Sequence, residues 1–281
     1  MKLVLFLVLY STSLFAQIKI QSEIQEIDQG TAGEETLFLF SSGHVAFLKR
    51  IPERDLSFLK QEIKKGSLFE AVINSNQDLI SIQKTRKRKS KLDFHTNNFL
   101  LNSPYLPTVL PSNEIAIDTF NKGRKDSKRV SQCFNRAHIW SFEWDNKYQI
   151  QTSKVWLFFT RKYIRRYRFE WWFHVAPTVL VKTPEGVKER VMDIKYLKGP
   201  ATIKQWTDVF IRDRSDCPII SKYSDYSHHP ESSLCYVQRS SPFYYQPVDL
   251  EKLELSGEEK NEWLSTDVKE AYREAFGITT F

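Results

Sequence analysis

The sequence predicts an α+β protein with a small β-rich N-terminal domain and a larger domain in which a helix packs on an antiparallel sheet. Three observations predict this architecture. Short runs rich in branched and aromatic residues alternate with turn residues in the first third of the chain. Apolar residues recur at helical spacing over about 133–144. Strand-like runs then follow at 155–160, 169–181 and 187–193.

The first residues, MKLVLFLVLYSTSLFAQ, are typical of a secretory signal peptide. Lys2 supplies the positive charge, Leu3 to Tyr10 form the apolar run, and Ala16 suits the position before cleavage. The apolar run is shorter than the roughly 18 residues of a spanning helix, and no other run approaches that length. We therefore expect residues 1–16 to be removed. The remaining chain should be exported to the periplasm or beyond the cell, without stable insertion in a membrane.

Residues 17–83 are predicted to form the small β-rich domain. ETLFLF and HVAFLK flank residues 41–43 as one hairpin, and LFEAVI and LISIQK flank residues 74–78 as another. Between the hairpins, Asp55 is expected to cap a helix over residues 56–65.

Positive charge is concentrated in two runs of this chain, whose formal net charge is +7. KTRKRKSK at 84–91 holds six positive charges, and RKYIRRYR at 161–168 holds five. The first run opens a proline-rich stretch, so we expect residues 84–112 to be an exposed linker that trypsin-like proteases can cut. Neither run accompanies a zinc-finger, helix-turn-helix or RNP pattern, and we therefore expect no nucleic-acid partner.

Residues 113–281 are predicted to form the second domain. Ser131 is expected to cap the helix over 133–144, and Pro184-Glu185-Gly186 to form the turn between the last two predicted strands. Residues 221–245 are expected to be irregular. Further helices are predicted at 113–121, at 202–212, and at 266–276 with Thr266 as its cap.

The three cysteines divide into a pair and a single residue. Cys217 and Cys235 lie 18 residues apart in a loop-rich segment, and the simplest pairing joins them in a disulfide. This pairing leaves Cys133 free, at the start of the predicted helix. A free cysteine in an exported protein indicates either a reactive thiol or a small buried apolar residue.

Cys133, His174 and Asp193 follow one another in the chain order of papain-like and transglutaminase-like enzymes. In such a set a thiolate attacks a carbonyl carbon, an imidazole transfers the proton, and a carboxylate fixes the imidazole tautomer. The helix start favours a thiolate, and strand alternation predicts that Trp172 shares a face with His174. From spacing alone, a buried core Cys, a satisfied His and a strand-end Asp remain the alternative.

Asp225, His228 and His229 form the one cluster with metal-ligand character, but no fourth ligand stands at the usual spacing. We therefore expect no metal and no cofactor.

Three sequence blocks together resemble the bacterial protein-glutaminase family: SQCFNRAH at 131–138, WWFHVAPTVLV at 171–181 and VKERVMD at 187–193. That family carries a Cys–aromatic–x–Arg–Ala–His block, a Trp–x–aromatic–His–Val–Ala block, and an Asp that closes the next strand. The matching positions are Cys133, Phe134, Arg136, Ala137 and His138, then Trp171, Phe173, His174, Val175 and Ala176, then Asp193. Ser131-Gln132 departs from the Asp-Gly that can precede the family nucleophile.

The resemblance implies a papain/transglutaminase-like core and hydrolysis of protein-bound glutamine to glutamate and ammonia through a Cys133 thioester. It also implies an N-terminal pro-region. Trp171, Trp172 and Ser131 are then expected to bind substrate, and the partners are glutamine-bearing proteins or peptides acted on by a monomer. Two alternatives stay open. A transglutaminase would use the same triad with an amine acceptor, and an exported binding module would keep the fold without catalysis.

Overall fold

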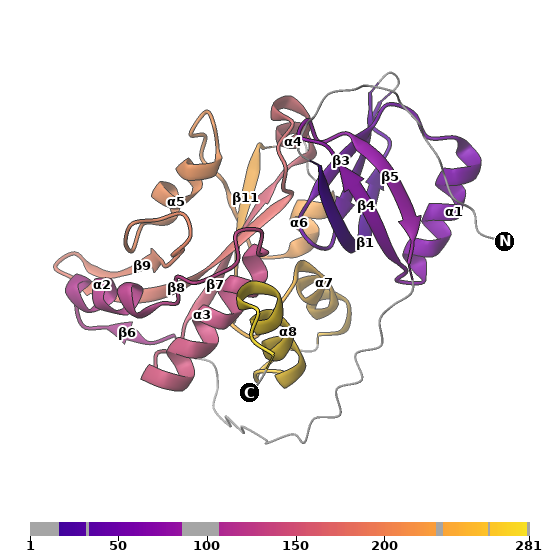
Figure 1. Cartoon of the computed structure of the whole chain (residues 1–281). Coiled ribbons are helices and arrows are strands. Elements are labelled where there is room, and N and C mark those ends of the chain that lie inside the picture. The colour runs from indigo at the N-terminus through magenta and orange to yellow at the C-terminus, as the bar shows by residue number, and fades with distance from the viewer. Residues whose placement is uncertain (1–16, 32–33, 86–106, 229–232, 258, 280–281) are drawn as a thin grey trace. The chain divides into compact units, whose positions relative to one another are not determined.

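The computed structural model describes residues 17–31, 34–85, 107–228, 233–257 and 259–279 (Figure 1). Its mixture of helices and sheets confirms the predicted α+β class. The chain divides into two compact units: unit 1 comprises Met1–Phe94 and Tyr163–Trp172, and unit 2 comprises His95–Lys162 and Phe173–Phe281. The predicted signal peptide and most of the predicted linker lie outside the described residues, so those two predictions stand as they were made.

Unit 1 contains a five-stranded antiparallel sheet in the order β3-β2-β1-β4-β5. Both predicted hairpins are present, β2–β3 and β4–β5. The sequence analysis missed the central strand, because Ser22 occupies an inward-facing position between Ile20 and Ile24 and breaks the apolar alternation. The strands are β1 (Ile18–Asp28), β2 (Thr36–Phe40), β3 (Val45–Leu48), β4 (Leu68–Ile73) and β5 (Leu79–Lys84).

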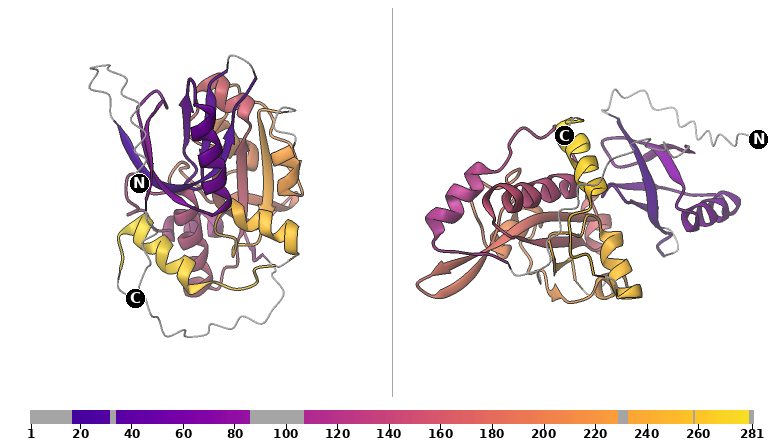
Figure 2. Two further views of the ribbon diagram at one scale, coloured as in Figure 1. Left: turned by 90° about the vertical axis from the view of Figure 1, so that its right-hand side faces the viewer. Right: turned by 90° about the horizontal axis from the view of Figure 1, so that it is seen from below.

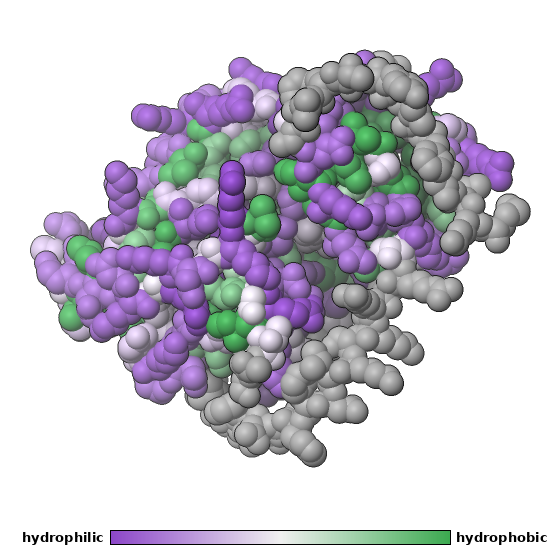
Figure 3. Space-filling model, in the orientation of Figure 1, coloured by the Kyte–Doolittle hydropathy of each residue, from purple (hydrophilic) through white to green (hydrophobic). Residues whose placement is uncertain are grey.

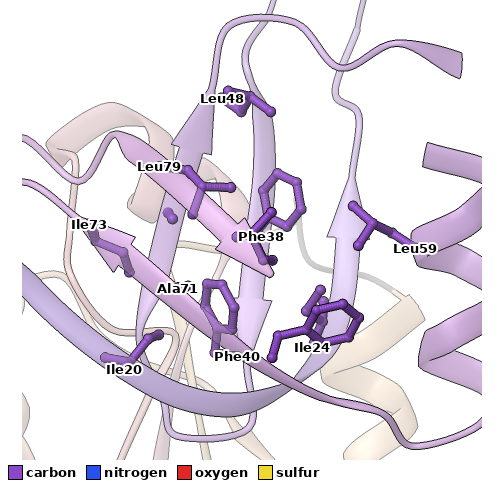
Figure 4. Close-up of a cluster of buried hydrophobic side chains, with 12 residues drawn as sticks. Ile20, Ile24, Phe38, Phe40, Leu48, Leu59, Ala71, Ile73 and Leu79 are labelled. Carbon is purple, nitrogen blue, oxygen red and sulfur yellow. The ribbon is translucent and has the colours of Figure 1, made fainter. Parts of the chain in front are cut away.

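Helix α1 (Glu53–Lys64) follows β3 and covers the apolar interior of this sheet. The prediction that Asp55 caps it was wrong: Pro52 occupies the N-cap position and Asp55 lies inside the first turn. Proline fixes the extended backbone that lets the helix begin earlier. Figure 4 shows the core, in which α1 contributes Leu59 to side chains from all five strands. Those side chains are Ile20, Ile24, Phe38, Phe40, Ala46, Leu48, Phe69, Ala71, Ile73, Leu79 and Ile82.

Residues 163–172 also belong to unit 1, although they follow a strand of unit 2. The predicted strand over 169–181 begins only at Phe173, so the prediction that Trp172 shares a strand face with His174 was wrong. The backbone N–H of Trp172 donates to Gly43 O at 3.0 Å instead. The sequence is aromatic on both sides of the start of β8. Apolar character alone therefore did not show that the residues before Phe173 pair with a different part of the chain.

Unit 2 contains a six-stranded sheet in the order β10-β11-β7-β8-β6, and β9 pairs with β8. The long strands pair antiparallel, as predicted, whereas β6 on β8 and β10 on β11 are short parallel pairs. The β8–β9 hairpin turns at Pro184-Glu185, with Gly186 at a φ of 105° that a side chain disfavours. The strands are β6 (Val109–Leu110), β7 (Ser153–Phe159), β8 (Phe173–Thr183), β9 (Gly186–Val191), β10 (Ile219–Ile220) and β11 (Cys235–Ser240).

Helix α3 (Cys133–Tyr148) contacts both β8 and α8 (Ser265–Phe276), and Figure 2 shows it from two further sides. Trp140 and Trp144 of α3 join an apolar cluster with Val179 and Val181 of β8, so the helix is fixed to the sheet. The other helices of the chain are α2 (Asn113–Lys122), α4 (Arg161–Tyr167), α5 (Ile203–Phe210), α6 (Tyr223–His228) and α7 (Pro247–Ser256).

Several local predictions for unit 2 were wrong. Gln132 rather than Ser131 holds the N-cap position of α3, and Leu264 rather than Thr266 holds that of α8. Residues 221–245 were expected to be irregular, but they contain α6 and β11. The serines and prolines around β11 have low strand propensity, so the sequence did not indicate a strand there. The strand is stabilised by antiparallel pairing with β7.

Within the described ranges, no helix combines the length and the apolar character needed to cross a bilayer. The face drawn in Figure 3 is largely hydrophilic, with hydrophobic residues in small groups between polar ones.

Candidate active site

Cys133 is the first residue of α3, is half-buried and takes part in no disulfide. The preceding Gln132 is extended, with φ −71° and ψ 148°, and makes no side-chain cap. The N–H groups of the first turn of a helix have no partner within the helix, and the helix dipole is positive at this end. The start of α3 can therefore stabilise negative charge on the Cys133 sulfur and on an oxygen beside it.

His174 and Asp193 meet through a hydrogen bond of 2.7 Å between Nε2 and Oδ2. Both side chains are about 1% exposed. His174 lies near the start of β8, and Asp193 lies two residues beyond the end of β9 rather than on the strand as predicted. The Met192 N–H donates to Pro177 O at 2.8 Å, which extends the β8–β9 pairing and turns Asp193 toward His174.

The Cys133 side chain interacts with the His174 ring and contributes to raising the pKa of the imidazole. Because Asp193 takes Nε2, Nδ1 is the nitrogen left for the thiol. The structure thus brings together the three residues that the sequence analysis selected, with the imidazole between the sulfur and the carboxylate.

The electrostatics favour a protonated imidazole. Burial alone would lower the pKa of His174, but the charge and hydrogen bond of Asp193, with the hydrogen bond of Cys133, raise it to about 9. Burial opposes ionisation of Asp193, but His174, a hydrogen bond from Trp206 and the charge of Arg136 hold its pKa below the usual value. An imidazolium between a carboxylate and a thiol can form an ion pair with a thiolate.

Aromatic side chains that the sequence analysis did not select surround this pair. The rings of Phe210, Tyr196 and Trp206 lie 4.4, 5.1 and 5.6 Å from the His174 ring, centroid to centroid. Trp206 Nε1 also donates to Asp193 Oδ2 at 2.9 Å. These rings limit the access of water to the pair, and Trp206 fixes the carboxylate. The capping pattern predicted helix α5, but nothing local showed that it carries a partner of Asp193.

Arg136 was noted only as part of a sequence block, yet it connects both sides of the site. It is 3% exposed, and one guanidinium nitrogen donates to the Ser131 carbonyl and, at 3.1 Å, to Ser131 Oγ. The guanidinium carbon lies 5.9 Å from the centre of the Tyr196 ring. Arg136 therefore fixes the turn before Cys133 while its charge stabilises ionised Asp193.

The structure gives less support to the three residues that were expected to bind substrate. Ser131 Oγ donates a hydrogen bond to Lys128 O at 2.8 Å and accepts one from Arg136. Its hydroxyl is therefore already used both as a donor and as an acceptor within the protein. Trp171 and Trp172 lie in unit 1, whereas Cys133, His174 and Asp193 belong to unit 2. Substrate binding by these three residues stays a prediction.

A second histidine on α3 has a different environment. His138 and Lys154 are fully buried, and Lys154 Nζ lies 2.9 Å from His138 Nδ1 and donates to Tyr244 O at 2.6 Å. Burial and the lysine hold the pKa of His138 well below its usual value. This imidazole packs against the Tyr245 ring. Within the described part of the chain, its hydrogen-bond partner is Lys154 Nζ and not a carboxylate. It is therefore a less suitable proton carrier than His174.

The remaining predicted residues concern a disulfide and a metal. The structure joins Cys217 to Cys235, at the start of β11. Across the described part of the chain, no three His, Cys, Asp or Glu side chains gather as a metal site would require. His229, from the weak metal cluster, lies outside that part.

Comparison with known proteins is consistent with this geometry. Residues 112–210 match the model of a glutaminase family. No curated protein sequence matches the chain. A crystal structure of a pro-protein-glutaminase has a TM-score of 0.50 and 16% identity, covering 84% of this chain and 92% of that one.

Two further solved structures are similar to this chain. The A47Q2 mutant of pro-protein-glutaminase has a TM-score of 0.50 and 15% identity, covering 89% of this chain and 97% of that one. The NMR structure of protein-glutaminase from Chryseobacterium proteolyticum has a TM-score of 0.36 and 17% identity, covering 54% and 91%. The pro-form structures share the fold of this chain, and the family match spans Cys133, His174 and Asp193. Over residues 112–210 the chain therefore carries a domain of the glutaminase family, as its sequence blocks predicted.

Proposed function

We propose that this chain is an exported protein-glutamine glutaminase, which hydrolyses the side-chain amides of protein-bound glutamine. The observation that carries the proposal is the buried His174–Asp193 hydrogen bond beside the half-buried Cys133, all inside the glutaminase match. The proposed core is papain/transglutaminase-like, with the nucleophile at the start of a helix that packs on the sheet.

Each residue has a defined role in the proposed reaction. The Cys133 thiolate attacks the side-chain carbonyl carbon of glutamine, and the first turn of α3 stabilises the resulting oxyanion. The His174 imidazolium gives its proton to the leaving nitrogen, the C–N bond breaks, and ammonia departs. Water then attacks the thioester as His174 accepts one of its protons, and the C–S bond breaks to leave glutamate and the thiolate. Asp193 keeps the imidazole oriented throughout.

We further propose that residues 17–85 form a pro-segment. Two structures that share the fold with this chain are described as pro-protein-glutaminase and cover at least 84% of its length. In this proposal residues 1–16 direct export, and cleavage in the linker begins activation.

The direct experiment measures ammonia released from an unfolded glutamine-rich protein, with and without a primary amine. Wild-type protein that has been cut in the linker and separated from residues 17–85 should release ammonia in both cases and should leave the amine unbound. Incorporation of the amine would favour the transglutaminase alternative. Ammonia release no faster than in the Cys133→Ala variant would favour a non-catalytic binding module.

A further inference from the structure

The second half of the basic run at 161–168 belongs to unit 1, where its arginines contact N-terminal residues. Arg165 donates to Glu35 O at 2.6 Å and pairs with Asp28 Oδ2 at 2.7 Å. The Arg165 and Asp28 side chains are 18% and 23% exposed. A pair shielded to this degree is stronger than a fully exposed one, because less water competes for the charges.

Arg168 forms a second and larger set of contacts. Its guanidinium pairs with the carboxylates of Glu35 and Asp78 and donates to Asn76 O at 3.1 and 3.0 Å. The same group lies 4.1 Å from the centre of the Phe47 ring. The Arg168 backbone has a φ of 50°, a conformation that non-glycine residues rarely adopt. Such a conformation persists where surrounding contacts determine it, as they do here.

Backbone hydrogen bonds extend the contact to the residues just before β8. The Val45 N–H donates to Glu170 O, and the Trp172 N–H donates to Gly43 O, each at 3.0 Å. Trp172 is 1% exposed, and its Nε1 donates to Phe40 O at 2.8 Å. The β2–β3 hairpin is thus paired with a short extended segment from elsewhere in the chain.

We propose that residues 163–172 are a docking surface that holds residues 17–85 without a covalent link. The two parts are separated in sequence by the predicted linker, so a cut there leaves them on different polypeptides. The ion pairs and backbone hydrogen bonds do not depend on the linker. Residues 17–85 should therefore stay bound after cleavage and leave only when this surface is disrupted. If residues 17–85 inhibit the enzyme, activation then needs their release after the linker is cut. This consequence for activity rests on the proposed function.

The test uses the full chain with a recognition sequence for a site-specific protease placed between residues 92 and 100. After complete cutting at micromolar concentration, gel filtration should show the two pieces eluting together. Arg165→Gln with Arg168→Gln should raise their dissociation constant about 100-fold or more, since each charged hydrogen-bonding group contributes about tenfold. Arg166→Gln is the matched control, because this exposed neighbour loses the same charge and should change little.

Separation of the wild-type pieces after cutting would overturn the proposal. Equal retention in the double variant and in wild type would overturn the assigned role of the two arginines. Circular dichroism of the uncut double variant checks that both parts are folded, and Asp78→Asn with Asp28→Asn tests the same pairs from the other side. This binding measurement needs no catalysis, so it is decided independently of the glutaminase proposal.

Discussion

Replacing Asp193 by Asn changes the charge beside His174 while keeping the shape of the side chain. In the wild type, Asp193 Oδ2 accepts hydrogen bonds from His174 at 2.7 Å and from Trp206 at 2.9 Å. Asparagine can present either its oxygen or its NH₂ group to the ring, and it carries no negative charge. The imidazolium would then be buried without the carboxylate that stabilises it.

The structure gives the size of the expected effect. A His174 pKa of about 9 in place of 6.5 corresponds to about 3 kcal/mol in favour of the imidazolium. Burial acts in the opposite direction, so Asp193 and Cys133 together supply at least this amount. Losing most of it should lower kcat about 100-fold. The pKa of His174 should also fall, so the high-pH limb of the rate profile, where this proton is lost, should move to lower pH.

Steady-state ammonia release between pH 5 and about 10 measures both quantities. Asp126→Asn is the matched control, because this carboxylate pairs with Arg124 and does not contact His174. Circular dichroism should show that both variants are folded. An Asp193→Asn enzyme with near wild-type kcat and an unmoved high-pH limb would refute the role given to Asp193.

Two further predictions follow from other contacts of the domain. Arg136→Lys keeps the charge but loses the guanidinium nitrogen that donates to the Ser131 carbonyl and hydroxyl, so kcat and the rate of Cys133 alkylation by iodoacetamide should each fall about tenfold, with KM less affected. Arg124→Lys should change neither rate, and a purely structural role for Arg136 would lower only the melting temperature. Cys217→Ser with Cys235→Ser opens a disulfide between residues 18 apart and should lower the free energy of unfolding by about 3 kcal/mol, measured by urea denaturation. An unchanged unfolding midpoint would contradict this stabilisation.

Local sequence signals were sufficient for the parts of the fold and site that depend on neighbouring residues. The apolar spacing predicted α3 from Cys133, although the helix continues to Tyr148. The turn at Pro184-Glu185 predicted the β8–β9 hairpin, and with it the approach of the chain after β9 to His174. The chemistry of the residue types then indicated Cys133, His174 and Asp193, which the structure brings together.

Long-range contacts could not be predicted in this way. Trp206 reaches Asp193 from a separate helix, and no periodicity in the sequence encodes that meeting. The run containing Trp172 was assigned to one strand, because nothing local shows that its first residues pair with the β2–β3 hairpin. No local signal identified the partners of Arg165 and Arg168, since Asp28 and Asp78 precede them by 137 and 90 residues.

Peptide-level mass spectrometry of a glutamine-rich protein substrate tests the central claim most directly. The wild-type protein, cut in the linker and separated from residues 17–85, should convert glutamine side chains to glutamate and leave the substrate backbone intact, whereas Cys133→Ala prepared in the same way should convert none. Conversion by Cys133→Ala at the wild-type rate, or cleavage of the backbone in place of side-chain conversion, would contradict the account.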